Sequence, residues 1–478
     1  MKVVLAGFNV DAEVLARLNS ENRETLTPET FSAAYARISR SEKDVALLRR
    51  QACLDVASAR KSNRRIVYAM GHHSVAEHAV FNFDVSGISR LALEILEHFR
   101  LVSFTEKSQR YVKIDGPFIV PEEIGLAEDH QAFKKVVFEQ FDFYRKSIKR
   151  IEEYLKLEAA SRDDEKKIAE WAKEDARYVL PLACEAQLGM TVNGRNLEYM
   201  IRSFQAHELA EVRKLGAQLH RQGSALAPSI VLFTDPSPFD LKQKKLFSDC
   251  PAGPDPGENK VPDSMNRIVY CTTGGDDLIL EALGFTLAGL PFPGGKGAFP
   301  GNAKKRIYLD LFSGMEFFDR PPREFELVDV VFSTVVSASC FAQLKRHRMA
   351  TLLVHDYEPE LGNIMPEIFY QLGIDGEFRR VQADTFEVYR KLRERFGRPA
   401  DYVLTNSHCR RVLVKMNLRE IYHFSRLRED EHAQWEIRRL AAWLSSEVRA
   451  RVPLAGMMLG GKSDFKKLLE NLQKARID

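Results

Sequence analysis

The sequence predicts two domains, each of which combines β-rich segments with amphipathic helices. At 478 residues, the chain exceeds the usual size of a domain with a single core. Its apolar periodicity is interrupted at 236–265, where Pro, Gly, Asp and Lys dominate, as is typical of linkers. The order of elements is similar on both sides of this segment. We therefore expect one domain over 1–235, a linker over 236–265 and a second domain over 266–478.

The composition is that of an ordinary globular protein, with 45% apolar and 29% charged residues. A formal net charge of +3 is small for this length, so we expect no nucleic acid partner. Six cysteines occur without a CxxC pair, which argues against a structural zinc site and a disulfide framework. The N-terminus lacks the features of a signal peptide, and no apolar run is long enough to span a bilayer. These features predict a cytoplasmic protein without a bound metal.

Periodicity predicts the main elements of each half. In the first half, residues 2–9 form a predicted strand, and apolar residues recur at helical spacing in 42–61, 136–157 and 195–219. In the second half, 326–336 is β-rich and 418–448 is predicted to be one long helix. Between them, TTGGDDLILEAL at 272–283 is predicted to cap a helix.

The two halves also share short matching segments. FNFDVSGISRLALEILEHFR leads to Arg100, and VVFSTVVSASCFAQLKRHR leads to Arg348. ARYVLP matches ADYVLT, and NGRNLEYMIR matches NLREIYHFSR. Weak identities at parallel positions, with a period near half the chain length, are typical of a diverged domain duplication.

In the first half, polar and basic residues gather at 98–113, HFRLVSFTEKSQRYVK. Hydroxyl, guanidinium and backbone N–H donors together suit a phosphate monoester. A solvated basic loop is the alternative interpretation. Upstream, His73, Glu77 and His78 are spaced HxxxEH, which differs from the zinc peptidase motifs. We therefore expect a structural or cofactor-contacting helix start at this position.

In the second half, Gln343, Arg346 and His347 fall at helical spacing and are followed by Arg348. Consecutive basic residues are usually a surface feature, but these end an apolar helix that should be buried. Two interpretations therefore stay open, an anion or cofactor site and a surface feature. Further on, a helix is predicted from 417 to 439. It places Asn417 and Arg428 on one face, with His432 one turn beyond Arg428. The alternative is a solvated face with salt bridges among Arg426, Glu429 and Glu436.

Taken together, these segments resemble the flavin-dependent thymidylate synthases, whose signature is RHR followed after seven residues by Ser. The resemblance covers much of 65–230 and 320–455. In the first half it rests on Glu77-His78, on Gly87 to Arg90, on Ser108 to Tyr111, on ARYVLP and on Asn193-x-Arg195. It implies an α+β fold in each half, with long helices packed on an antiparallel sheet.

Each half departs from the family where the other half matches it. The first half has His98-Phe99-Arg100 instead of RHR, Ile95 instead of glutamine, and no clear arginine at the catalytic position near Ser203. The second half has Gln343, the RHR motif and Arg428, but Asp356 replaces the signature serine and Asp401 replaces the arginine retained as Arg177. An aspartate in a phosphate pocket repels a dianion, so the second half alone should not bind deoxyuridylate.

The resemblance implies a composite active site, because family members build their sites across the subunits of a tetramer. It implies that FAD is the cofactor and that deoxyuridylate (dUMP), methylenetetrahydrofolate and NADPH are the substrates of a reductive methylation to thymidylate. Arg428 would be the catalytic residue, stabilising negative charge on the uracil ring. The implied dUMP contacts are Glu106, Lys107, Ser108, Gln109, Arg110, Arg177, Gln343 and Arg346. The implied FAD contacts are Ser74, Glu106, Arg346, His347, Arg348, Asn193, Arg195, Asn417, Arg419 and His423.

We expect a homodimer that imitates the tetramer of single-domain chains, with one complete site per chain or per pair of chains. The reciprocal site, which combines both sets of losses, should be inactive. Two alternatives remain open: a diverged homologue that binds flavin or nucleotide without catalysis, and an enzyme of the same fold that acts on another pyrimidine or folate.

Overall fold

The computed structural model describes residues 1–16, 26–114, 116–158, 164–244, 246, 265–293 and 299–477. The chain forms two compact units: unit 1 is Met1–Pro256 with Pro366–Thr405, and unit 2 is Gly257–Met365 with Asn406–Asp478. Most of the predicted linker, Lys245 and 247–264, lies outside the described residues, and its first part contains α10 (Pro238–Lys244). Unit 1 includes residues 366–405, which belong to the second half of the sequence, so the two compact units do not coincide with the two predicted domains. The domain boundaries at 235 and 266 therefore stay a prediction.

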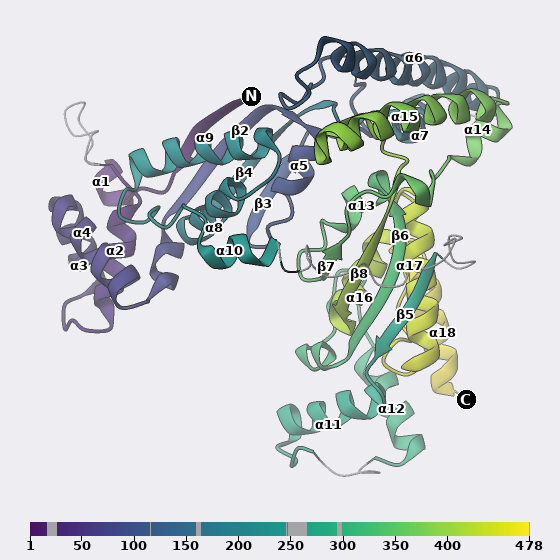
Figure 1. Ribbon diagram of the computed structural model, residues 1–478. Helices are drawn as coiled ribbons and strands as arrows, with labels where there is room; N and C mark the ends of the chain where they lie inside the picture. Colours follow the sequence, from purple (N-terminus) through teal and green to yellow (C-terminus); the bar gives the residue numbers. More distant parts are fainter. Residues whose placement is uncertain are drawn as a thin grey trace. The chain divides into compact units, whose positions relative to one another are not determined.

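Each unit contains one four-stranded antiparallel sheet, which confirms the α+β fold class (Figure 1). The strand order is β1-β2-β4-β3 in unit 1 and β5-β6-β8-β7 in unit 2, so the two sheets have the same topology. The strands of unit 1 are β1 (Lys2–Phe8), β2 (Val80–Ser89), β3 (Val102–Glu106) and β4 (Glu185–Asn193). Those of unit 2 are β5 (Asn266–Cys271), β6 (Asp329–Ser337), β7 (Thr351–Val354) and β8 (Cys409–Asn417).

Alternation of apolar and polar residues gives each sheet one buried face. In β2, Phe81, Phe83 and Val85 are buried, whereas Asn82 and Asp84 between them are exposed. Burial alternates with the same period in β6, where Val330, Phe332, Thr334 and Val336 are buried. The strands β1 and β6 confirm the two β-rich segments predicted from the sequence.

Three corresponding helices pack on each sheet. In unit 1, α5 (Arg90–Leu96) contacts β2, α8 (Gly194–Gln205) contacts β4, and α9 (Ala210–Leu226) contacts β1. In unit 2, α13 (Ala338–Leu344) contacts β6, α16 (Leu418–Arg428) contacts β8, and α17 (Trp435–Arg451) contacts β5. Even the caps correspond: Ser89 caps α5 and donates to Glu211, and Ser337 caps α13 and donates to Glu436. This correspondence supports the predicted duplication.

Several predicted helices are interrupted. The segment 42–61 is divided at Asp55 into α3 (Val45–Leu54) and α4 (Val56–Asn63), because the Asp55 carboxylate accepts from Ser58 N and starts a new helix. The prediction of one helix over 195–219 is wrong, since α8 and α9 are separate. In contrast, α6 (Ala127–Glu158) extends the helix predicted at 136–157.

The predictions of a single helix over 417–439 and of one long helix over 418–448 are also wrong, because this segment forms α16 (Leu418–Arg428) and α17 (Trp435–Arg451). Helix α16 ends at Arg428, and α17 begins after Gln434, whose side chain accepts from the backbone N–H groups of Glu436 and Ile437. His432 is therefore not one helical turn beyond Arg428. Its ring lies 2.8 Å from the carboxylate of Asp430.

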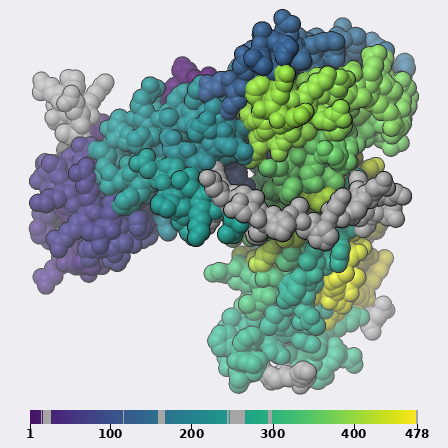
Figure 2. Space-filling model, in the orientation of Figure 1, coloured from purple at the N-terminus to yellow at the C-terminus, as the bar shows by residue number. Residues whose placement is uncertain are grey.

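We call the two matching halves of the chain the first and the second repeat. One segment of the second repeat packs in unit 1. Helix α15 (Asp375–Phe396) contacts α6, and Figure 2 shows their surfaces, green and blue, side by side. Gln140 of α6 donates to Thr385 Oγ1 and to Val403 O at 2.8 and 2.9 Å. Nearby elements are α7 (Asp164–Ala176), α14 (Glu367–Gln371) and the 3-10 helices η4 (Arg177–Val179) and η7 (Arg398–Val403).

The remaining helices of unit 2 are α11 (Gly275–Ala288), α12 (Gly301–Leu311), α18 (Phe465–Ile477) and the 3-10 helices η5 (Arg323–Leu327) and η6 (Pro359–Leu361). Helix α11 begins inside the predicted capping segment 272–283, after Gly274, whose φ of 66° favours glycine. Among the helices of the described ranges, none is long and apolar enough to cross a membrane.

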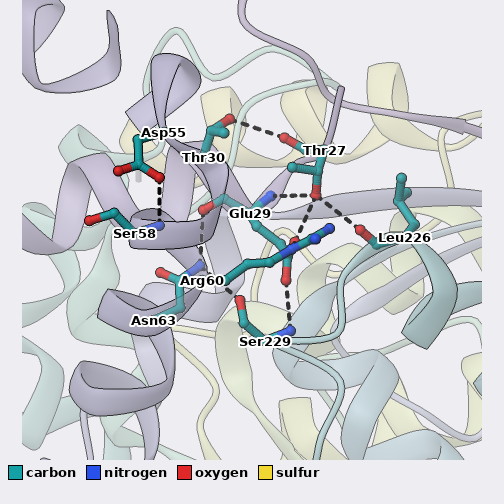
Figure 3. Close-up of polar contacts among 9 residues, drawn as sticks. All are labelled: Thr27, Glu29, Thr30, Asp55, Ser58, Arg60, Asn63, Leu226 and Ser229. Atoms are coloured by element: carbon teal, nitrogen blue, oxygen red, sulfur yellow. Dashed lines mark hydrogen bonds and ion pairs between the residues drawn. The ribbon is translucent and has the colours of Figure 1, made fainter. Parts of the chain in front are cut away.

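A helical layer precedes the first central strand of unit 1. It contains α1 (Ala12–Ala16), α2 (Glu29–Ile38), α3, α4, the π-helix η2 (Arg64–Ala69) and the 3-10 helix η3 (His73–His78). Figure 3 shows how the buried carboxylate of Glu29 joins this layer to the segment after α9. It accepts from Arg60 Nε and from Ser229 N, both at 2.6 Å, and from Thr27 Oγ1 at 3.1 Å. A buried carboxylate with three donors is satisfied, and it fixes the layer in place.

Replacing Glu29 with alanine is expected to lower the free energy of unfolding by about 2–3 kcal/mol, because buried donors lose a charged acceptor. Urea denaturation followed by circular dichroism measures this loss. Glu13→Gln is the matched control, since the Glu13–Arg50 ion pair is open to solvent, which screens it, and should contribute much less than the buried carboxylate of Glu29. Equal effects of the two substitutions would contradict the role assigned to Glu29.

Candidate active site

Three arginines from separate segments of unit 1 gather near the end of strand β3, namely Arg90 of α5, Arg110 of the loop after β3 and Arg177 of η4. Arg90 at the start of α5 pairs with Glu106 at 3.0 Å, and Arg110 pairs with Glu174. Arg177 donates from Nε to Glu174 O at 3.3 Å. Arg90 and Arg177 are buried, so these guanidinium groups are held by structure and are not mobile surface charges. We call Arg90, Arg110 and Arg177 the arginine cluster.

The charges of the cluster influence each other. Burial lowers the pKa of Arg177, Glu174 opposes this shift, and the charges of Arg110 and Arg90 lower the pKa further. An arginine remains protonated despite such shifts, so the three guanidinium groups outnumber the carboxylates of Glu106 and Glu174 beside them and leave net positive charge in a partly desolvated place. This arrangement suits a phosphate dianion, which pairs with several guanidinium groups at once.

The predicted dUMP loop is ordered by its own hydrogen bonds. Ser108 Oγ accepts from Arg110 N at 3.1 Å, and Lys107 N donates to Gln187 O at 3.0 Å. Glu106 and Lys107 line a cavity of about 590 Å³ over the sheet of unit 1, while Gln109 is half-buried. The structure thus brings Glu106, Lys107, Ser108, Arg110 and Arg177 into one region.

Two predicted first-half FAD residues, Asn193 and Arg195, lie at the start of α8. Asn193 caps this helix, since its Oδ1 accepts from Asn196 N at 2.9 Å, and Arg195 pairs with Glu77 of η3 at 2.7 Å. Gly194 permits this close packing, because a Cβ there would lie 2.9 Å from Ala76 O. Ser74 is exposed on η3. The described residues contain no group of three His, Cys, Asp or Glu side chains that suits a metal ion.

In unit 2, the turn after α13 meets the end of α16. Arg428 donates from Nε to His347 Nε2 at 3.0 Å and from Nη2 to Gln343 O at 3.2 Å. His347 Nδ1 lies 3.2 Å from Glu420 Oε1. Burial lowers the pKa of His347 well below its usual range, and the nearby Arg428 and His423 lower it further. Because Arg428 donates to Nε2, this nitrogen is an acceptor and carries no proton, so the imidazole is neutral.

Gln343 is 8% exposed, and its Nε2 donates to Gln434 Oε1 at 3.4 Å. Its Oε1 is buried without a hydrogen-bond partner in the described structure. A buried acceptor without a donor is costly, so this atom fits an N–H group of a ligand.

A second cavity, of about 520 Å³, lies at the start of α16. It is lined by Asn417, Arg419 and His423, with Glu420, Phe317 and Lys462 beside them. Asn417 caps the helix through Glu420 N, and Arg419 donates to Glu326 Oε1 and to Pro321 O, both at 2.8 Å. Arg346 is half-buried and Arg348 is exposed. Three predicted FAD residues thus share one cavity.

The polar pair of unit 2 has an apolar counterpart in unit 1. Eleven residues after the helix cap, Arg428 corresponds to Phe204, and His347 corresponds to Phe99 in the RHR segment. Phe99 and Phe204 pack edge to face with ring centroids 5.5 Å apart, so rings replace the His347–Arg428 hydrogen bond. The replacement keeps the packing but removes the guanidinium group.

At the described positions of the second half that correspond to the arginine cluster, Ala338, Glu358 and Asp401 replace the three arginines. His355 and Arg411 pair with Glu358, which stands where the first half has Arg110. Arg410 lies over the rings of Phe341 and Tyr357 and donates to His355 O. Protein side chains therefore occupy this region. Asp401, the counterpart of Arg177, is buried in unit 1 and pairs with Arg393 at 3.4 Å.

Three site residues escaped the sequence prediction: Arg90, Glu174 and Glu420. Arg90 ends the Gly-Ile-Ser-Arg turn, which was noted only as part of the resemblance. Glu174 lies three residues before Arg177, one helical turn away, and this spacing was a usable signal. Glu420 had no signal, because its partner His347 is 73 residues away.

Comparison with known proteins supports both halves of this description. The model of the family described as thymidylate synthase complementing protein matches residues 23–229 and 316–454. A UPF0159 protein from Thermoplasma acidophilum, Ta1429, is 24% identical over 445 residues, which span 83% of this chain and 87% of that protein. The flavin-dependent thymidylate synthase of Clostridium tetani is 32% identical over 175 residues, 36% of this chain and 69% of the enzyme. That of Geobacter sulfurreducens is 33% identical over 193 residues, 39% of this chain and 72% of the enzyme.

The matched segments contain the arginine cluster in one repeat and the His347–Arg428 pair in the other. Together they cover most of the chain, and the chain belongs to the family of thymidylate synthase complementing proteins, with both of its repeats matched.

Proposed function

We propose that the protein is a flavin-dependent thymidylate synthase that converts dUMP to thymidylate with methylenetetrahydrofolate and NADPH. The observation that carries this proposal is the complementarity of the two repeats. The arginine cluster is present only in the first repeat, and the His347–Arg428 pair is present only in the second. Random decay of a duplicated enzyme would not spare one copy of each group.

In this proposal, the first repeat binds the nucleotide phosphate. Arg90, Arg110 and Arg177 supply the positive charge, and Ser108 supplies a hydroxyl group. Glu106, Lys107 and Gln109 complete the loop. The second repeat binds the base, where Gln343 Oε1 is a buried acceptor for a ring N–H group and Arg346 lies close in sequence.

The residues present also fit FAD, which supplies hydride transfer when it is bound and reduced. The cavity at α16 offers Asn417, Arg419 and His423 beside the exposed ring of Phe317, a combination of polar and aromatic groups that suits a flavin nucleotide. Arg346, His347 and Arg348 would add contacts from the RHR turn. Ser74, Asn193 and Arg195 offer the equivalent groups in unit 1.

Arg428 would act on the pyrimidine ring. Uracil C5 is a weak nucleophile until negative charge develops on the ring, and a guanidinium group held near N3 and its carbonyl groups stabilises that charge. The two hydrogen bonds to His347 and Gln343 fix the guanidinium plane before substrate binds. The protein would thereby contribute position and charge.

The test begins with an absorbance spectrum of the purified protein, reconstituted with FAD where necessary. Then dUMP, methylenetetrahydrofolate and NADPH are added under low oxygen, and thymidylate is assayed by chromatography. Flavin bands with thymidylate support the proposal. Flavin without product would favour the alternative of a flavin or nucleotide binder or of another pyrimidine substrate, and a protein that takes up no FAD would overturn both.

A charge swap between the repeats tests the phosphate site. Ser108→Asp copies Asp356 into the first repeat and is expected to weaken dUMP binding roughly 30-fold or more, because two like charges meet in a partly buried place. Asp356→Ser is the matched control and should leave the affinity unchanged. Isothermal titration calorimetry with dUMP measures both. A larger effect of the control substitution would place the phosphate in the second repeat.

A further inference from the structure

Three side chains in unit 2 form a hydrogen-bonded chain from a buried carboxylate to the expected catalytic guanidinium. Glu420 Oε1 lies 3.2 Å from His347 Nδ1, and His347 Nε2 lies 3.0 Å from Arg428 Nε. Glu420 and Arg428 belong to α16, whereas His347 belongs to the turn after α13. Glu420 and His347 are 8% and 3% exposed, so the contact is shielded from water.

The position of the imidazole proton follows from this geometry. A guanidinium nitrogen only donates, so His347 Nε2 must accept from Arg428. A neutral imidazole has one N–H group, which must then be on Nδ1, pointing at the Glu420 carboxylate. The carboxylate therefore selects the tautomer that binds Arg428. If the proton moved to Nε2, two N–H groups would face each other and Arg428 would lose this contact.

Comparison with the first repeat supports the view that Glu420, His347 and Arg428 act together. Glu420 corresponds to Asn196, His347 to Phe99 and Arg428 to Phe204, so all three polar groups are changed together in the repeat without the catalytic arginine. Asn196 instead bonds to the helix cap Asn193. A carboxylate that served only to start α16 would not need to change with the other two.

We propose that Glu420 is a positioning residue for thymidylate formation, which holds the His347 tautomer and through it the guanidinium group of Arg428. The inference rests on the proposed function in one respect, since the positioned group is the one expected to act on the pyrimidine. Arg428 is half-buried at the last residue of α16, and a long side chain at a helix end needs such a partner to keep one orientation.

The test compares Glu420→Ala, Glu420→Gln and the control Glu431→Gln in the full chain. Glu431 is exposed beyond the same helix, so its substitution should leave all measurements unchanged. The expected result for Glu420→Ala is a fall in kcat of roughly 10- to 100-fold with little change in the KM for dUMP, because misplaced charge impairs the reaction more than binding. Glutamine keeps an acceptor for Nδ1–H and should restore much of kcat.

A second measurement needs no activity. With ¹⁵N-labelled histidine and arginine, nuclear magnetic resonance of the purified protein should show His347 as the Nδ1–H tautomer and a slowly exchanging Arg428 Nε–H group. Glu420→Ala should change the His347 signals and speed the exchange of Arg428 Nε–H. If these signals are unchanged, Glu420 does not position Arg428, whatever the activity. If they change as expected in a protein without thymidylate formation, the positioning stands and the proposed function fails.

Discussion

Replacing Arg428 with alanine is expected to lower the rate of thymidylate formation by roughly 10²- to 10³-fold, with folding preserved. Removal of one prearranged donor to a developing negative charge has effects of this size in other enzymes. The arginine is half-buried, and its hydrogen bonds to His347 and to Gln343 O are not needed to bury apolar surface. Steady-state kinetics under low oxygen, with thymidylate measured by chromatography, give the rate.

Two control variants separate chemistry from folding. His98→Ala alters the first-repeat counterpart of the RHR motif and should matter little, because Phe99 and Phe204 stand there in place of the proposed catalytic pair His347 and Arg428. The triple substitution His347→Phe, Glu420→Asn and Arg428→Phe copies the corresponding first-repeat residues into unit 2 without leaving a buried carboxylate beside an apolar ring, so the variant should fold with little activity. Comparable rates for Arg428→Ala and the natural protein would remove Arg428 from its assigned role.

The fold was predictable wherever local patterns determine it. The β-rich composition of 326–336 located β6, and the apolar periodicity of 136–157 located α6. The interruptions were missed because they depend on single side chains that cap a new helix inside a continuous apolar pattern, as Asp55 and Gln434 do. Such caps change the chain direction without changing composition, so periodicity alone does not reveal them.

The site was predictable to the extent that motifs name residue types. The resemblance identified Arg428, His347 and Arg177, and the structure adds what surrounds them. Glu420 and Glu174 could not be found in this way, because their roles depend on contacts formed only after folding. The sequence also does not reveal that Phe99 and Phe204 are a matched replacement for His347 and Arg428. The structure shows it, because the two members of each pair are in contact.

Mixing two inactive variants is expected to show whether a site is completed within one chain or between two. Arg110→Ala removes part of the arginine cluster proposed to bind phosphate, and Arg428→Ala removes the proposed catalytic group, so each variant alone should lose at least roughly 90% of its activity. In a mixed dimer, sites completed between chains would include one with an intact first repeat and an intact second repeat. About half of the natural activity should then return, by counting sites under the duplication hypothesis.

Co-expression with two different affinity tags and sequential purification isolates the mixed dimer, and mass spectrometry confirms that both chains are present. A folded mixed dimer without activity would mean that each site is built from the first and second repeats of the same chain, because every chain in the mixed dimer has one defective repeat. Dimers with Arg110→Ala in both chains are the matched control for residual rate. If Arg110→Ala alone retains the natural rate, the arginine cluster does not serve the reaction, and the composite site that both repeats are proposed to build is wrong.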